Sequence, residues 1–386
     1  MAGGHSRIGA GEPAPYFHAK ALNNPRFAFD TAAGRWLVLC FVGSAGDAAG
    51  ARAIAAAKAR TDLFDDSHAA LFVVTSDPRD LAEKRIADRY PGFRHFLDFD
   101  LAVSRLYGVA PQEAAAGEAV ALRRAWVVID PTMRIHEVIP FRPDGADVAE
   151  ALACVERLPP PDRFAGVELQ APIIVLPRVF EPELCRHLVN LYETVGGVES
   201  GFMREVDGRT VGVLDAAHKR RKDCEITDET LLAAIRQRFV RRVVPEIRKV
   251  HQFAVTRMER YIVACYAAED GGHFRAHRDN LTKGTAHRRF AASVNLNEDF
   301  EGGEVSFPEY GPRGFRPPAG GAVVFSCSLL HRVSRVTAGR RYAFLPFLYD
   351  DAAAEIRERN RGFIGAADPA EGGDDGAPAS RTPPAA

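Results

Sequence analysis

The stretch RYIVACYAAEDGGHFRAHRD, residues 260–279, joins a short apolar run to a glycine-containing turn and a second extended segment. The same texture continues to residue 349, where short apolar runs alternate with turns that contain Gly, Asn or Asp. Such runs are typical of antiparallel strands, and several in series predict a barrel or a double-sheet roll. Upstream, apolar positions at helical spacing predict helices from Pro182 and over residues 228–248. The C-terminal half is therefore expected to be mainly β with flanking helices.

The N-terminal half has a different pattern, with strands that alternate with helices. Helices are predicted at residues 48–60 and 78–90, and strand alternating with helix indicates a parallel-type α/β layer. A tight hairpin turn is expected at Pro131-Thr132-Met133, between the last two strands. Runs rich in Val, Ile and aromatic residues predict the strands themselves: 36–43, 69–75, 124–130 and 134–140.

A proline cluster at residues 159–161 separates these halves and predicts a semi-rigid spacer. We therefore expect an α/β domain at residues 8–157, a linker at 158–170 and a mainly β domain at 171–352. Residues 366–386 consist largely of Ala, Gly, Pro and Asp, and a segment without large apolar residues is expected to be disordered.

Composition restricts the class of protein. The 50 basic residues nearly balance the 51 acidic ones, so no charge excess favours nucleic acid or an anionic membrane. The first 35 residues contain no apolar run of signal-peptide length, and no later run approaches the roughly 18 residues that a membrane span needs. Six cysteines without a C-x-x-C pattern indicate free, buried thiols. These features predict a cytoplasmic protein.

Two histidines and one aspartate in the C-terminal half are candidate metal ligands. His277 and Asp279 are two residues apart, so on an extended segment their side chains lie on the same side of the backbone. His331 ends the run AVVFSCSLLH, where a neighbouring strand could bring it alongside. Two imidazoles and a carboxylate on one face of an octahedral ion are the ligand set of non-haem Fe(II) oxygenases. A 2-oxo acid and O2 would take the three remaining positions.

Arg341 follows His331 by ten residues, inside the run VTAGRRYAFLPF. Strand alternation lets Arg341 and Ala343 face one side while Arg340 and Tyr342 face the other. An inward arginine in an apolar barrel is costly unless it meets an anion. A planar guanidinium suits the distal carboxylate of 2-oxoglutarate as a two-point partner.

With these residues in place, residues 172–350 resemble the prolyl 4-hydroxylase-like branch of the iron(II)/2-oxoglutarate dioxygenases. The resemblance implies a double-stranded β-helix (jelly roll), with His277, Asp279 and His331 as iron(II) ligands and Arg341 as the anchor of the 2-oxoglutarate co-substrate. It implies hydroxylation by O2 with release of succinate and CO2, and it leaves open whether L-ascorbate is needed. Four ordered blocks carry the resemblance: 177–193, 260–279, 293–311 and 320–344.

Four further residues of interest lie within these blocks. Tyr266 stands where this family often has a tyrosine that touches 2-oxoglutarate, although a tyrosine on a half-buried strand is also an ordinary core residue. His273 precedes His277 by four residues and is expected to line the mouth of the site or to face solvent. Gly302 and Gly303 are expected to form a bulge or tight turn.

Residues 8–157 resemble a thioredoxin-fold redoxin of the peroxiredoxin type. The likeness rests on WLVLCFVGSAGDAAGARAI at 36–54 and RRAWVVIDPTMRI at 123–135, and it places Arg124 at that family's catalytic arginine. Gly50, however, stands where the family has its reactive cysteine. Cys40 lies inside the preceding apolar strand, where burial would raise the pKa of the thiol. The resemblance therefore implies a pseudo-redoxin that could bind a protein partner, shield the dioxygenase mouth or add stability.

Two other functions compete with a dioxygenase. A thiol peroxidase would need a nucleophilic cysteine that this alignment does not supply. A catalytically silent binding or scaffold protein would have no need to hold the three ligands and Arg341 together. The substrate stays open, because one fold supports hydroxylation of peptidyl proline, other protein side chains or small molecules.

Overall fold

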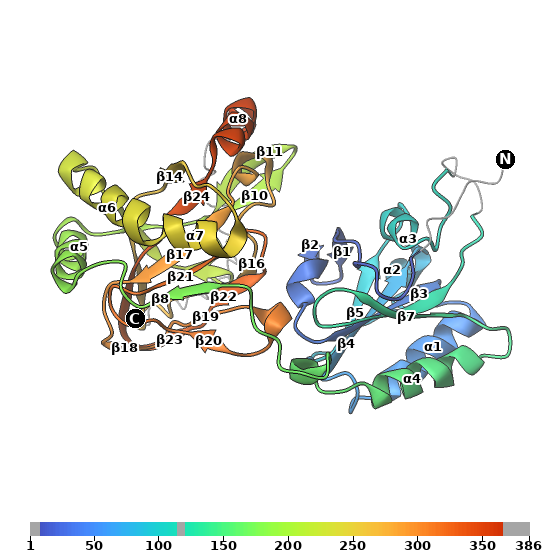
Figure 1. The fold of residues 1–386 in the computed structure, drawn as a ribbon. Coiled ribbons are helices and arrows are strands. Elements are labelled where there is room, and N and C mark those ends of the chain that lie inside the picture. Colours follow the sequence, from blue (N-terminus) through green and yellow to red (C-terminus); the bar gives the residue numbers. More distant parts are fainter. Residues whose placement is uncertain (1–7, 114–119, 366–386) are drawn as a thin grey trace, which may run out of the picture. The chain divides into compact units, whose positions relative to one another are not determined.

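The computed structural model describes residues 8–113 and 120–365. The chain forms two compact units, one built mainly from residues up to Pro172 and one built mainly from Ile173 onward (Figure 1). The disorder expected for residues 366–386 concerns a segment outside the described residues. Within the described ranges, no helix combines the length and the apolar character that crossing a membrane requires.

The N-terminal unit is a seven-stranded sheet in the order β2-β1-β5-β4-β3-β6-β7. β3 pairs in parallel with β4, and β4 with β5, whereas β6 and β7 run antiparallel to their neighbours. This is the thioredoxin-like arrangement expected from the sequence. The strands are β1 (His18–Ala21), β2 (Asn24–Ala28), β3 (Trp36–Gly43), β4 (Ala69–Thr75), β5 (Phe93–Leu97), β6 (Ala125–Ile129) and β7 (Ile135–Pro140).

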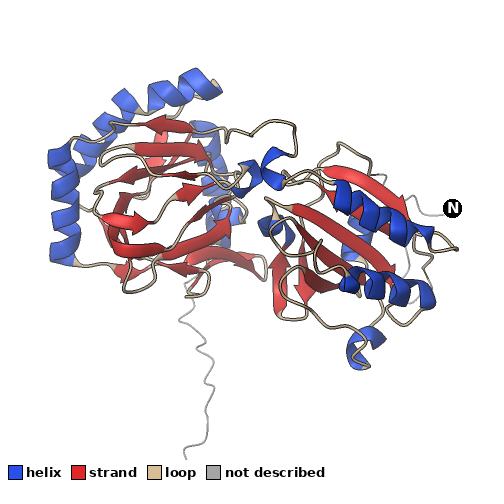
Figure 2. Cartoon of the chain, turned by 90° about the horizontal axis from the view of Figure 1, so that it is seen from below, coloured by secondary structure: helices blue, strands red, loops and turns tan. Residues whose placement is uncertain are grey.

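Two helices, α1 and α4, lie side by side on one face of this sheet (Figures 1 and 2). Their apolar residues join β3, β4 and β6 in one core, which explains why the central strands are apolar along their whole length. The helices and short 3₁₀ turns of this unit are α1 (Ala48–Ala59), α2 (Arg79–Ala82), α3 (Ala102–Leu106), α4 (Ala146–Arg157), η1 (Phe29–Ala32) and η2 (Pro161–Arg163).

The helix predicted at residues 78–90 is wrong beyond its first turn, since α2 ends at Ala82. Asp80 is fully buried, and its carboxylate accepts hydrogen bonds from the Ala45 amide at 2.7 Å and the Thr75 hydroxyl at 2.5 Å. Lys84 has a φ of 54°, which no α-helix continues through. The buried carboxylate thus holds this segment as a turn.

The strands from Ile174 onward form two mostly antiparallel sheets, arranged as a double-stranded β-helix. The larger sheet has the order β14-β24-β17-β23-β15-β13-β9, with β8, β18 and β21 attached, and the smaller has the order β12-β16-β22-β19-β20. A separate hairpin is formed by β10 (Phe202–Val206) and β11 (Arg209–Val213). The remaining strands are β8 (Ile174–Leu176), β9 (Val198–Glu199), β12 (Lys219–Arg220), β13 (Lys222–Glu225), β14 (Arg257–Glu259), β15 (Ile262–Ala267), β16 (His273–His277), β17 (Phe290–Asn295), β18 (Phe300–Gly302), β19 (Val305–Ser306), β20 (Gly314–Phe315), β21 (Ala322–Ser326), β22 (His331–Val333), β23 (Val336–Phe344) and β24 (Phe347–Tyr349).

Helices cover one face of the larger sheet. Where one helix was predicted at 228–248, the chain forms two, because Pro245 lies in the first turn of α7 and supplies no N–H to continue α6. The helices and 3₁₀ turns are α5 (Pro182–Val195), α6 (Glu229–Arg242), α7 (Val244–His251), α8 (Asp351–Arg359), η3 (Lys283–Thr285), η4 (Pro308–Tyr310) and η5 (Arg361–Phe363).

Strand alternation decides which side chains point away from these helices. Cys265 of β15 and Tyr342 of β23 belong to the core that includes α5, α6 and α7. Tyr266 and Arg341 are each one residue away, so they point to the opposite face of the sheet. The two residues are also paired directly across β15 and β23. The fold therefore places Tyr266 beside Arg341 on the inner face of the roll.

Candidate active site

The three predicted metal ligands come together. His277 ends β16, Asp279 follows it by two residues, and His331 opens β22, the next strand in the smaller sheet. Their ligand atoms all lie within 4.8 Å of one another, and His277 Nε2 is 3.6 Å from Asp279 Oδ1. Two imidazoles and one carboxylate at this spacing fit a divalent ion that prefers mixed nitrogen and oxygen ligands.

Neighbouring groups orient these ligands. His277 Nδ1 lies 2.7 Å from the Arg275 carbonyl oxygen, so that nitrogen carries the proton and Nε2 is left to bind metal. The imidazole stacks on Phe274, with ring centroids 3.5 Å apart. The backbone N–H of Asp279 donates to the Cys327 carbonyl at 3.0 Å. Backbone contacts thus fix His277 and Asp279.

Arg341 is buried, with a relative exposure of 2%. Its Nε and Nη2 donate to Asn295 Oδ1 at 3.1 and 2.9 Å, and Nη2 also donates to Ser293 Oγ at 2.7 Å. The Asn295 amide is itself fixed, because its Nδ2 donates to the Pro317 carbonyl at 2.8 Å. Arg341 Nη1 has no hydrogen-bond partner within the described part of the chain.

These contacts join the buried Arg341 cation to neutral groups, and no ion pair with a carboxylate is seen for it among residues 8–113 and 120–365. Burial lowers the pKa of Arg341 to about 10, which shows how strongly the surroundings disfavour its charge. The guanidinium carbon lies 5.4 Å from the centroid of the Tyr266 ring. A carboxylate bound at Nη1 would supply both the missing hydrogen bond and the missing charge. The residues present therefore fit a 2-oxo dicarboxylic acid.

Arg340 lies on the opposite face of β23 from Arg341, as the alternation along the strand predicts. It is exposed, and its Nε donates to Glu269 Oε1 at 2.7 Å. One step along β23 thus separates a solvated arginine, paired on the surface, from a buried one with an open N–H group.

A second cluster of buried charges was not predicted. Arg221 donates from Nε to Asp223 at 2.7 Å and from Nη1 to the Tyr266 hydroxyl at 3.3 Å. Lys219 is 4% exposed and donates to the Ser200 hydroxyl at 2.8 Å. Burial lowers the pKa of Lys219, and Arg221 lowers it further. The run KRRKD at 219–223 has the composition of a solvent-exposed charged segment. Its one clue to burial is that Lys219, Arg221 and Asp223 alternate, so on an extended segment their side chains share one face.

The remaining predicted residues do not join the metal site. His273 Nδ1 lies 2.8 Å from the Gly271 carbonyl oxygen, and the side chain is outside the His277 group. Gly302 and Gly303 have φ values of 72° and 65°, and the pairing of β18 with β23 shifts register at Gly302. Both glycines form the bulge that was expected.

We expect Gly303→Ala to weaken 2-oxoglutarate binding, by roughly tenfold or about 1.4 kcal/mol. A Cβ at Gly303 would lie 2.9 Å from Arg341 Cδ and would push the guanidinium out of place. Gly208→Ala is the matched control, because Gly208 has a φ of 74° but open space around its Cβ position. Titration of both variants with 2-oxoglutarate separates the effect of the Cβ–Arg341 contact from the effect of backbone strain. An equal loss of 2-oxoglutarate affinity in both variants would contradict the role of that contact.

The N-terminal unit has no reactive thiol at the start of α1. Asp47 caps this helix by accepting from the Gly50 amide at 2.8 Å, and the same carboxylate binds Arg124 Nη1 at 2.8 Å. A Cβ at Gly50 would lie 2.0 Å from the Ser44 carbonyl oxygen. All six cysteines are buried and free, and burial raises the pKa of Cys40 well above its usual range. The helix start therefore offers Arg124 a carboxylate partner and no nucleophile.

Comparison with known proteins assigns both halves. Residues 261–349 match the model of the 2OG-Fe(II) oxygenase superfamily, and residues 10–138 match the AhpC/TSA family. One segment of the chain is thus similar to the AhpC/TSA family and another to the 2OG-Fe(II) oxygenase superfamily. Every predicted metal ligand, together with Tyr266 and Arg341, lies in the segment matched by the oxygenase model.

Similar proteins are known for each domain. A PKHD-type hydroxylase of Synechococcus sp. (strain JA-2-3B'a(2-13)) is 26% identical over 123 residues, which are 30% of this chain and 50% of that protein. The chain thus spans about half the length of this curated relative. A prolyl hydroxylase from Trichoplax adhaerens, solved with a hypoxia inducible factor peptide fragment, is 18% identical with a TM-score of 0.38, covering 49% of this chain and 87% of that one. Peroxidoxin BcpB from Mycobacterium tuberculosis is 18% identical with a TM-score of 0.34, covering 40% of this chain and 99% of that one.

We expect the AhpC/TSA domain to show no peroxidase activity above that of ordinary free thiols. The reason is that Gly50 offers no nucleophile and that Cys40 is buried with a raised pKa. Hydrogen peroxide consumption with a thioredoxin donor is the measurement. Rapid turnover that disappears in Cys40→Ser would show that this thiol is reactive after all.

Proposed function

We propose that residues 171–352 form an iron(II)- and 2-oxoglutarate-dependent dioxygenase. In this proposal the enzyme hydroxylates a substrate with O2 and releases succinate and CO2. The observation that carries it is the buried guanidinium of Arg341, which has an open Nη1 and lies beside Tyr266 in the same domain as the His277, Asp279 and His331 group. Residues 8–157 would form a separate domain and residues 158–170 the linker.

The protein's own part in the reaction is to bind and orient. His277, Asp279 and His331 would hold iron(II) through two imidazoles and one carboxylate. The bound iron and 2-oxoglutarate supply the oxidative chemistry. Arg341 would hold the distal carboxylate through Nη1. The Tyr266 hydroxyl accepts from Arg221, so its own proton is available for donation to the same carboxylate.

The substrate would be a peptidyl proline, another protein side chain or a small molecule, and L-ascorbate would keep the iron reduced. Six buried, free cysteines support a cytoplasmic location, where thiols stay reduced. The AhpC/TSA domain would act as a pseudo-redoxin that binds a protein partner or stabilises the chain.

Release of succinate from 2-oxoglutarate tests the proposal. The purified full chain with Fe(II) should release succinate when candidate peptides or a cell extract are added. Asp279→Ala is the control that keeps the fold but loses a proposed ligand. Succinate release that is equal in both proteins would overturn the proposal, and so would the absence of 2-oxoglutarate binding to the Fe(II) protein.

A further inference from the structure

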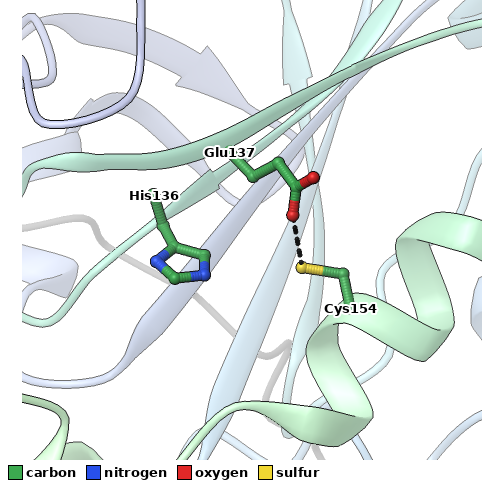
Figure 3. Close-up of side chains that lie close together, drawn as sticks. All are labelled: His136, Glu137 and Cys154. Carbon is green, nitrogen blue, oxygen red and sulfur yellow. Dashed lines mark hydrogen bonds between the residues drawn. The ribbon is translucent and has the colours of Figure 1, made fainter.

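A second group of metal-binding side chains lies in the N-terminal unit, on β7 and α4. The ligand atoms of His136, Glu137 and Cys154 all lie within 4.8 Å of one another. The Cys154 thiol donates to Glu137 Oε2 at 3.2 Å, and the His136 imidazole lies beside this pair (Figure 3). The proposed dioxygenase reaction uses none of these side chains.

A β-bulge explains how two neighbouring residues of one strand reach the same site. His136 and Glu137 would normally point to opposite faces of the sheet. In the pairing of β6 with β7, however, Val128 opposes Glu137 and Ile129 opposes Ile135, so His136 is an extra residue. A bulge redirects a side chain in this way. β7 is the last strand of the sheet, and on its other side Ile135 is hydrogen-bonded to Gly11 and Glu12.

Of the three side chains, the exposed His136 has the most freedom to change its position. Cys154 is 5% exposed and is held by α4, whereas His136 is exposed and contacts Trp36 edge-on, with ring centroids 5.1 Å apart. Ligand atoms around a tetrahedral zinc ion are about 3.5 Å apart, given bonds of roughly 2.0–2.3 Å. A small rotation of the exposed His136 side chain would bring the group to that spacing.

We propose that His136, Glu137 and Cys154 bind a divalent ion of the zinc type, with water at the fourth position. One sulfur, one nitrogen and one oxygen ligand suit this class of ion, whereas magnesium and calcium take oxygen ligands. On binding, the metal–sulfur bond replaces the S–H bond of Cys154, and the proton passes to water. The ion would tie the edge strand β7 to α4.

Cobalt(II) alone is the probe, because only a cysteine ligand gives it an intense thiolate-to-metal charge-transfer band. The chelator-treated full chain should show this band on titration with cobalt, and zinc should remove it by competition. A chain carrying both His277→Ala and Asp279→Ala should keep the band, because the oxygenase group contains no sulfur. Cobalt binding measured in this double variant therefore does not depend on whether the proposed dioxygenase site exists.

Four single variants complete the test. Cys154→Ser should lose the band, and Cys185→Ser, a change at another buried free cysteine, should keep it. Glu137→Gln and His136→Ala should lower cobalt affinity by at least about 10–100-fold. Substitution of residues that only contact a metal's ligands already causes a loss of this size. If circular dichroism shows that Cys154→Ser is unfolded, the cobalt affinities of Glu137→Gln and His136→Ala test the site in its place. No thiolate band in the unmodified chain, or unchanged affinity in Glu137→Gln and His136→Ala, would overturn the proposal.

Discussion

Replacing His277, Asp279 or His331 by alanine should abolish turnover and weaken Fe(II) binding by more than about 100-fold. Changes around a metal's direct ligands already cost about 10–100-fold, and loss of a ligand removes one of three contacts that fix the coordination geometry. The measurements are Fe(II) titration under anaerobic conditions and succinate release. Full activity in any of the three variants would remove that residue from the ligand set.

His273→Ala is the control for this series. His273 lies on the same strand as His277, and its Nδ1 lies within hydrogen-bond distance of a backbone carbonyl oxygen instead of joining the ligand group. The variant should therefore keep Fe(II) affinity, which shows that the loss in the other variants is not a general effect of removing an imidazole from β16.

Arg341→Ala should raise the 2-oxoglutarate requirement by roughly one to two orders of magnitude. The change removes the proposed charge-assisted contact at Nη1, where a hydrogen bond is worth on the order of 1.5–3 kcal/mol. Affinity for Fe(II) should barely change, because Arg341 is not among the metal ligands. An anaerobic titration of the Fe(II) protein with 2-oxoglutarate, followed by the metal-to-ligand charge-transfer band, measures the first quantity, and an anaerobic titration with Fe(II) measures the second.

Arg340→Ala is the matched control, since it removes the same side chain one residue away. Arg340 is exposed and pairs with Glu269, so its loss should leave the requirement within a few-fold of the unmodified chain. If Arg340→Ala is damaging and Arg341→Ala is silent, the anchor must be reassigned to Arg340.

Periodicity explains what could be predicted from the sequence. The runs at 36–43 and 69–75 became β3 and β4 with unchanged bounds, because apolar runs buried on both faces leave little ambiguity. The burial of Arg341 followed from alternation along β23 and from its place in an apolar run.

Features that depend on a partner segment could not be predicted. The segment after Pro78 has helical residues, but a turn forms there because Asp80 is buried against Ala45 and Thr75. The bulge at His136 depends on the register with β6, which no single strand reveals. Arg221 is buried against Tyr266 and Lys219 against Ser200, two partners distant in sequence that come near only in the folded roll.

If the proposed function holds, the open hydrogen bond of Arg341 would make the stability of the C-terminal domain depend on bound 2-oxoglutarate. A carboxylate bound at Nη1 is present only in the folded state, so its binding energy adds to the free energy of unfolding. At a concentration about 100 times the Kd, the gain is about 2.7 kcal/mol. The Tm of this domain should therefore rise as 2-oxoglutarate is added, and in Arg341→Ala the same rise should require more of it. Thermal stability in this protein would thus report the supply of a central metabolite.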